Sequence, residues 1–252
     1  MEHWHRSGQA LLNEISTTRL PASQLAVWSI GQCGFIFKYE ETVVCIDPVL
    51  SDLTGPSGSR RCYPAPFAPE ALRADRITTV QEGSILPLGG VTVRAFSAAH
   101  PEHILDTGDP GMALGYQLTF GGFTVAHLGD TYLTPHLYET LQALPRPDLL
   151  LAPINGQDFF RTQRNCIGNL EAEEAAQLAV RLGAACTIPT HYDMVQGNTV
   201  DPLRFAAALR QLDPAACFAL PALGERLLFQ ADAGRKDSRV FSCPPPSSSI
   251  QR

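Results

Sequence analysis

The chain has 252 residues, 44% of them apolar and 17% charged, which is a globular composition and excludes an intrinsically disordered protein. Its formal net charge of −6 argues against nucleic acid or an anionic membrane surface as the main partner. No apolar run reaches the roughly 20 residues of a membrane-spanning helix, and no signal-peptide core is visible. The seven cysteines form no C-x-x-C pair, so neither a disulfide framework nor a zinc ribbon is indicated. We therefore expect a reduced, soluble, cytoplasmic protein.

Strand signals dominate the first half of the chain. Three short β-rich runs separated by turns predict an antiparallel meander at 25–30, 34–38 and 42–46. A stretch rich in Pro, Gly and Ser then predicts a long loop over 51–69. Gly121 and Gly122 are typical of a two-residue hairpin turn between strands. The further strands expected in this half are 77–80, 91–95, 114–120 and 123–128.

Helix signals alternate with strands in the second half. Thr134 followed by Pro135 predicts the start of a helix. Asn169 is the predicted cap of a second helix, which has three glutamates near its start and Gly183 at its end. Asp201 and Pro202 predict a third helix that continues to residue 212. The strands expected between and after these helices are 148–152, 186–189 and 225–229.

This order of elements predicts a single α/β domain of two stacked sheets with helices outside. The first half is mostly β-meander, whereas the second half alternates strand and helix. We expect the domain to cover residues 1–233. The remaining stretch, 234–252, contains PPPSSS and is predicted to be a disordered tail.

Three predicted strands end in a side chain that can bind a metal ion. They are His100 in FSAAH, Asp130 in HLGD and His191 in IPTH. A rigid sheet can aim ligands from such positions, and two imidazoles with one carboxylate suit zinc, manganese or iron(II). The alternative, that each side chain only caps a loop, is common at polar strand ends. The recurrence at three strand ends favours a metal site.

Other polar residues give weaker signals. His3-Trp4-His5 lies at the terminus, and His103 and Asp106 lie in a loop that indicates surface positions. His127 is predicted to pack within its strand or to support a ligand from behind. Cys33 lies between turn residues and has no sign of an activated nucleophile. The chain has no G-x-S-x-G, P-loop or G-x-G-x-x-G motif, so serine-hydrolase and nucleotide-binding readings lack support.

Five segments follow one another across residues 10–230: VWSIGQCGFIFKYEETVVCIDPVLSD, SAAHPE, HLGDT, APINGQDFFRTQRNCIGNLEAEEAAQLA and IPTHYDMVQGNTVDP. Together and in this order they resemble the L-ascorbate-6-phosphate lactonase-like branch of the metallo-β-lactamase superfamily. The resemblance implies an αββα sandwich and a metal-dependent hydrolase, using zinc or manganese, that acts on a lactone or related ester. It implies that Asp130 is the catalytic carboxylate shared between two ions. Asp47 would support the ligands from behind.

The same resemblance suggests residues for substrate binding. Asn155, Arg161, Arg164 and Tyr192 lie in or beside the matching motifs. They either contact a small, anionic substrate or fix loops through polar contacts, and the sequence leaves both readings open.

The family's main metal motif, H-x-H-x-D-H, is absent from this chain. It is expected after Asp75, where Arg76 follows directly, so a strand, motif and helix of about 40–50 residues are missing by comparison. A two-metal clamp could not then be fully ligated, and His100, Asp130 and His191 would remain as a single site. We expect impaired activity, with Asp47 lacking a ligand to support and 77–80 covering the exposed sheet edge. The alternative is a non-catalytic remnant or binding protein on the same scaffold.

Overall fold

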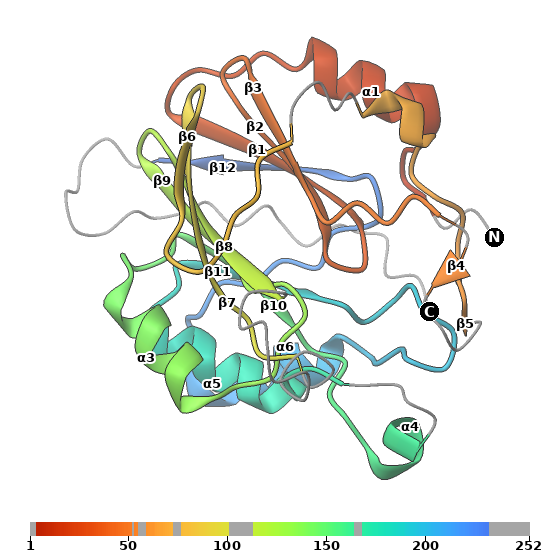
Figure 1. Ribbon diagram of the computed structural model, residues 1–252, viewed down its shortest axis with the longest axis vertical. Coiled ribbons are helices and arrows are strands. Elements are labelled where there is room, and N and C mark those ends of the chain that lie inside the picture. The colour runs from red at the N-terminus through yellow and green to blue at the C-terminus, as the bar shows by residue number, and fades with distance from the viewer. Residues whose placement is uncertain are drawn as a thin grey trace.

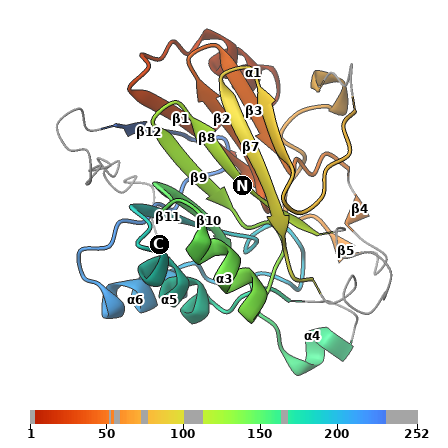
Figure 2. The ribbon, with the colours of Figure 1, turned by 60° about the vertical axis from the view of Figure 1, so that its left-hand side comes forward.

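Two β-sheets pack face to face with helices on both outer faces in the computed structural model (Figures 1 and 2). The structure describes residues 4–51, 53–54, 59–72, 77–100, 113–163 and 168–231. This arrangement is the predicted αββα sandwich of the α/β class. The predicted tail, the junction after Asp75, His103 and Asp106 all lie outside the described residues.

The smaller sheet has four antiparallel strands in the order β12-β1-β2-β3. They are β1 (Gln24–Gly31), β2 (Gly34–Tyr39), β3 (Thr42–Ile46) and β12 (Arg226–Gln230). Helix α1 (Gly8–Thr17), which the sequence reading did not predict, covers the outer face by packing Leu11 and Ile15 on this sheet. The buried Lys38 ammonium donates to the carbonyl of Ile15 at 2.7 Å, near the end of α1. A cation there satisfies carbonyls that a helix end leaves open.

The larger sheet has six strands in the order β11-β10-β9-β8-β7-β6. They are β6 (Ile85–Leu88), β7 (Val91–Ser97), β8 (Leu114–Phe120), β9 (Phe123–His127), β10 (Leu149–Pro153) and β11 (Cys186–Thr190). Neighbours from β6 to β9 pair antiparallel, whereas β9, β10 and β11 run parallel. Helices α3 (Pro135–Ala143), α5 (Ala172–Leu182) and α6 (Leu203–Leu212) cover the outer face (Figure 2).

Short elements lie outside the two sheets. They are β4 (Leu53–Thr54), β5 (Ser59–Arg60), the 3-10 turn η1 (Pro69–Ala71) and α4 (Phe159–Gln163). β4 and β5 pair with each other within the predicted long loop.

Most predicted elements are confirmed, with differences of one or two residues at their ends. The Thr134 hydroxyl accepts the amide proton of Leu137 at 3.1 Å and caps α3 as predicted. Gly183 ends α5 in the left-handed conformation, with φ 63°. The predicted cap at Asn169 is wrong, because the helix is capped two residues later by Glu171, which forms a capping box with Glu174.

The predicted strand at 77–80 is also wrong. These residues form no strand, and the Ile77 side chain is 89% exposed. The edge strand of the larger sheet is β6, which pairs with β7. Within the described part of the chain, no strand pairs with the outer edge of β3. Residues 77–80 therefore do not pair with this edge, although Thr78 and Val80 line a cavity together with residues 44–46 of β3.

Two further sequence expectations concern helices and thiols. None of the described helices combines the length and apolarity needed to cross a membrane. Cys33, Cys45 and Cys62 are free thiols, whereas the Cys217 thiol donates to the Cys186 sulfur at 3.1 Å.

Candidate metal centre

Three side chains with metal-binding atoms meet where the two sheets adjoin. Asp130 follows β9, His191 follows β11, and Cys33 lies in the turn between β1 and β2 of the other sheet. Their ligand atoms all lie within 4.8 Å of one another. His191 Nε2 lies 2.7 Å from Asp130 Oδ1, and the Cys33 thiol donates to the same oxygen at 3.3 Å. Three separate elements therefore supply one compact group of an imidazole, a carboxylate and a thiol.

The backbone around this group adopts conformations that side chains rarely allow. Gln32, Asp47 and His191 have φ values of 57°, 45° and 63°, in the left-handed region. Such positions cost free energy for residues other than glycine, and they cluster at functional sites. Gly129 has φ 67° just before Asp130, where the chain turns out of β9. The strain is therefore concentrated around the three side chains.

His127 fixes the turn that carries Cys33. The amide of Gly129 donates to His127 Nδ1 at 3.2 Å, so Nδ1 is an acceptor and Nε2 carries the proton. Nε2 then donates to the Cys33 carbonyl at 2.7 Å. The His127 ring is 1% exposed and lies edge-on to Phe35. This is the geometry expected for a residue that supports the site from behind.

The charges at the centre stabilise each other. Burial alone would raise the pKa of Asp130, but the His191 imidazolium and the hydrogen bonds from His191 and Cys33 lower it well below its usual range. Burial opposes a charge on His191, yet the adjacent Asp130 carboxylate raises the His191 pKa. The Asp130 side chain still exposes 47% of its surface, so solvent reaches the carboxylate.

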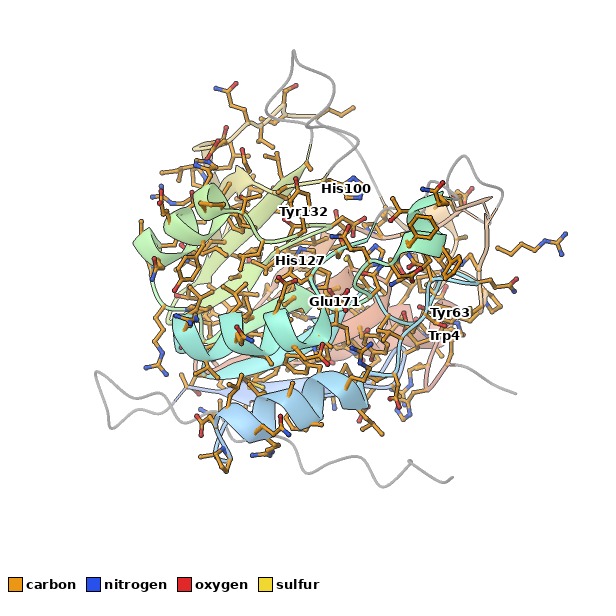
Figure 3. All side chains as sticks on the ribbon, turned by 90° about the horizontal axis from the view of Figure 1, so that it is seen from below. Trp4, Tyr63, His100, His127, Tyr132 and Glu171 are labelled. Atoms are coloured by element: carbon orange, nitrogen blue, oxygen red, sulfur yellow. The ribbon has the colours of Figure 1, made fainter. Side chains whose placement is uncertain are left out.

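Gln32 covers the His191 ring. Its side-chain nitrogen lies 3.0 Å from Nδ1 and 2.7 Å from Nε2, so the amide packs against both possible ligand atoms. The backbone amide of Gln32 donates to the Asp193 carboxylate at 3.3 Å, and the Tyr63 hydroxyl donates to the same carboxylate at 2.9 Å. Tyr63 in turn packs edge-on against Trp4 (Figure 3). An ion that binds His191 must displace the Gln32 side chain.

The third predicted ligand, His100, lies near the centre but outside the compact group. It follows the end of β7, beside Tyr132, whose amide donates to the Ala99 carbonyl at 3.0 Å (Figure 3). A charge on His100 contributes to the lowered pKa of Asp130, which places the two side chains within electrostatic reach. The structure thus brings together Asp130 and His191 of the predicted set, with Cys33 in place of His100.

Asp47 lies on the other side of the same centre, at the end of β3. Burial raises its pKa, and His127, Asp130 and His191 all act on its charge. The turn that carries Cys33 packs on the Asp47 backbone, because a Cβ at Gly34 would lie 3.1 Å from the Asp47 carbonyl oxygen. Its supporting role stays a prediction.

The predicted substrate-binding residues form a polar network of their own. Asn155 is 2% exposed; its amide donates to Asn198 at 3.2 Å, and Asn169 donates to it at 2.8 Å. Arg161 donates to both the Asn155 carbonyl and the Asn198 side chain at 2.7 Å. These contacts match the loop-fixing alternative. Tyr192 packs with the apolar cluster under α5, and Arg164 lies outside the described residues.

The sequence reading missed Cys33, Gln32 and Asp193 as parts of this centre. Its one local signal was the Gly31–Gly34 turn, which joins two strands whose ends reach the sheet rim. A hairpin turn alone does not tell which side chain faces the other sheet.

The donor set fits one divalent ion. A thiol, a carboxylate and an imidazole are the three ligand types that zinc prefers, and the thiol disfavours manganese. A bound ion would replace the protons that Cys33 and His191 hold next to Asp130. Among the residues that the structure describes, this is the single group of three or more such side chains close enough to hold an ion.

Comparison with known proteins shows the family of the chain. Residues 37–192 match the beta-lactamase superfamily domain. A UPF0173 metal-dependent hydrolase from Chloroflexus aurantiacus is 32% identical over 127 residues, 49% of this chain and 48% of that protein. Another from Methanoregula boonei is 31% identical over 141 residues, 55% of this chain and 59% of that protein. The chain thus spans about half the length of the curated relatives it matches.

Solved structures share the architecture at low identity. Igni18, a metallo hydrolase from Ignicoccus hospitalis, has a TM-score of 0.60 and 18% identity over 83% of this chain and all of its own. The metallo-β-lactamase fold protein YhfI from Bacillus subtilis has a TM-score of 0.57 and 14% identity over 82% of this chain and 99% of its own. The match over 37–192, more than half of the sequence, shows that this chain belongs to the β-lactamase superfamily, and its two sheets have the metallo-β-lactamase fold.

Proposed function

We propose that this chain is a metal-dependent hydrolase of the metallo-β-lactamase superfamily that acts on a lactone or related ester. The observation that carries the proposal is the compact group of Cys33, Asp130 and His191 at the sheet rim. The relatives described as metal-dependent hydrolases support the reaction class. The lactone or ester substrate rests on the resemblance of the sequence motifs to the lactonase-like branch.

Cys33, Asp130 and His191 would hold the ion. When bound, a divalent ion supplies Lewis-acid chemistry that polarises the bond to be cleaved and stabilises negative charge on its oxygen. The exposed part of the Asp130 carboxylate is accessible to a substrate carbonyl. Asp47, at the end of β3, interacts electrostatically with Asp130 and His191. His127 keeps the Cys33 turn in place through its bond to the Cys33 carbonyl.

We expect this activity to be low. Three protein ligands suffice for one catalytic ion, but the H-x-H-x-D-H motif that completes the family's two-metal clamp is absent from the sequence. The Gln32 amide also competes for His191. These two features favour the second candidate function, a protein that binds a metal ion without turnover.

Metal content and hydrolysis, measured together, test the proposal. The purified chain is dialysed against Zn²⁺, its bound metal is measured by mass spectrometry, and it is assayed on a lactone and a p-nitrophenyl ester. We expect about one ion per chain and slow hydrolysis that is lost with Asp130→Asn and His191→Gln. The control is His136→Gln, which changes an exposed histidine that pairs with Glu82 and does not belong to the group of ligands.

The outcomes separate the two candidates. One ion with hydrolysis that depends on Asp130 and His191 supports the hydrolase. One ion without hydrolysis favours the binding protein. Absence of bound zinc, or zinc retained equally by both ligand variants, contradicts the proposed centre.

A further inference from the structure

A cavity of about 480 Å³ lies between the two sheets at their β3 and β6 edges. Its volume falls in the range of roughly 300–1,000 Å³ that is typical of small-molecule sites. Alternate residues of β6, β7 and β8 line it, which are the residues whose side chains face the space between the sheets, and β3 contributes three consecutive residues at the sheet edge. The lining consists of Val44, Cys45, Ile46, Asp47, Thr78, Val80, Ser84, Leu86, Leu88, Val93, Ala95, Tyr116 and Leu118.

The chemistry of the lining is aliphatic along most of its length. Among the described residues, Asp47 is the one charged residue of the lining, and none of the described lysines and arginines belongs to it. Leu88 is 52% exposed on the edge strand, so the cavity opens to solvent there. An anionic head group would meet Asp47, with no cation from the described residues in the lining to offset the repulsion. The lining therefore selects an uncharged ligand with an apolar chain.

Asp47 connects the cavity with the candidate metal centre. It lines the cavity and also interacts electrostatically with Asp130 and His191. The Cys33 turn packs on the Asp47 backbone at Gly34. The apolar part of the cavity is thus open at the sheet edge, whereas its charged residue, Asp47, lies within electrostatic reach of the metal-binding side chains.

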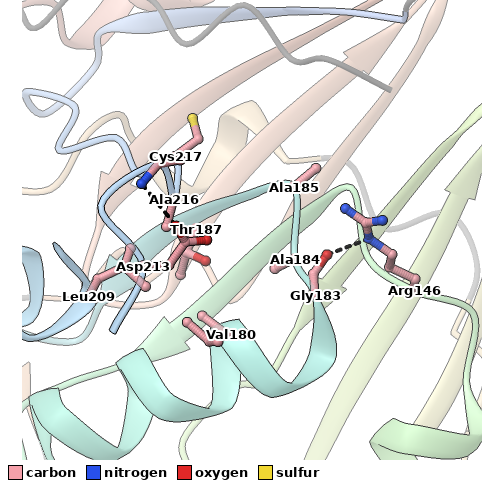
Figure 4. A pocket seen from close by; sticks show the side chains of 12 residues that line it. Arg146, Val180, Gly183, Ala184, Ala185, Thr187, Leu209, Asp213, Ala216 and Cys217 are labelled. Carbon is pink, nitrogen blue, oxygen red and sulfur yellow. Dashed lines mark hydrogen bonds between the residues drawn. The ribbon is translucent and has the colours of Figure 1, made fainter. Parts of the chain in front are cut away.

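A second cavity provides a contrast within the same molecule. It measures about 330 Å³ and lies at the outer side of the larger sheet, beside α5 and the loop after α6 (Figure 4). Arg146 and Asp213 give it two opposite charges, and Val180 lies at its wall. None of its lining residues belongs to the metal centre, so it offers a matched control for substitutions.

We propose that the cavity between the sheets binds the aliphatic chain of an uncharged ester or lactone and presents its carbonyl to the metal centre. The proposal rests on the proposed hydrolase function for the reaction, but the binding of an apolar chain can be measured without any metal or turnover. It replaces the anionic substrate considered from the sequence with a neutral, chain-bearing one.

Binding of a neutral fluorescent probe tests the cavity directly. The metal-free protein is titrated with N-phenyl-1-naphthylamine, and bound probe is displaced with methyl decanoate or with decanoate. We expect saturable binding of one probe per chain, with the neutral ester displacing it at least about tenfold more effectively than the anion. Val93→Phe fills the cavity and should weaken probe binding about tenfold or more. The control Val180→Phe, in the second cavity, should leave it unchanged.

A milder variant keeps the test valid if Val93→Phe disturbs the fold. Leu88→Gln changes a half-exposed residue at the mouth of the cavity and should weaken probe binding about threefold. If hydrolysis is detected, its kcat/KM should rise from the acetate to the decanoate p-nitrophenyl ester, and Val93→Phe should remove that rise.

The result can fail in two distinguishable ways. Probe binding that Val93→Phe and Leu88→Gln leave unchanged, or equal displacement by ester and anion, overturns the inference whatever the hydrolysis assay gives. Probe binding that disappears as the chain forms dimers assigns the cavity to an interface between copies and also overturns it. Neutral-ligand binding that both variants weaken supports the inference, even if the metal assay rejects the hydrolase.

Discussion

The space between the two sheets has a filled half and an open half. In the filled half, Phe37, Phe120 and Phe123 are at most 1% exposed, and rings from both sheets lie about 6 Å apart. In the open half, the small side chains of Val93 and Ala95 face a cavity beside β3 and β6, whose outer edges pair with no other strand of the described residues. The contrast indicates that aromatic packing in the filled half holds the two sheets together. The open half is therefore available for a ligand close to the metal centre.

The largest effect is expected in the filled half. Phe120→Ala should lower the free energy of unfolding by about 3–5 kcal/mol, because it removes a fully buried ring that contacts Phe37 and Tyr39. Urea denaturation followed by circular dichroism measures the change. A loss below about 1 kcal/mol would mean that the aromatic half does not hold the sheets together.

A smaller loss is expected in the polar network beside the metal centre. Asn155→Ala should cost about 1–3 kcal/mol, because Asn169 and Asn198 lose a buried partner. The same denaturation measurement applies. If Asn155 instead contacts substrate and does not stabilise the fold, the variant will have the same free energy of unfolding as the original chain, while its KM for an ester rises.

The open half should tolerate added volume. Val93→Phe, which would be overpacked in a filled core, should change the free energy of unfolding by less than about 1 kcal/mol because a cavity receives the ring. A loss similar to that of Phe120→Ala would show that the cavity is closed in solution and would remove the contrast between the halves.

The smallest effect concerns an exposed link at the open edge. The Ser97 hydroxyl donates to Glu82 at 2.7 Å, and together with His136 it lowers the pKa of that carboxyl. A carboxyl group whose pKa is lowered in the folded state stabilises the fold at pH values above the usual pKa of a glutamate. That contribution to the free energy of unfolding disappears as the pH falls through the lowered pKa. Ser97→Ala should raise the Glu82 pKa, which an NMR titration of the carboxyl resolves. An unchanged titration would show that this link is not formed in solution.

Much of the fold followed from the sequence because its signals are local. Thr134 with Pro135 and Gly183 act through their own backbone, so the ends of α3 and α5 were predictable. The strand expected at 77–80 failed because β-propensity does not tell whether a partner edge is available. The edge position is taken instead by β6, whose hairpin with β7 turns at Gly89 and Gly90.

The site was predictable only in part, for a related reason. Asp130 and His191 follow parallel strands of one sheet, and such strand ends meet at a common rim. Cys33 comes from the other sheet, so its approach depends on how the two sheets stack. The conformations of Gln32 and His191 at positive φ also arise from tertiary contacts and have no sequence signature.

The most direct test of the account is the absorption spectrum of the Co²⁺-loaded chain. Coordination by a thiolate gives a charge-transfer band in the near ultraviolet, so a metal held by Cys33, Asp130 and His191 should show it. Cys33→Ser should abolish the band. Cys45→Ser should retain it, because the Cys45 thiol lies outside the group. A spectrum without the band, or a band that survives Cys33→Ser, would contradict the proposed centre.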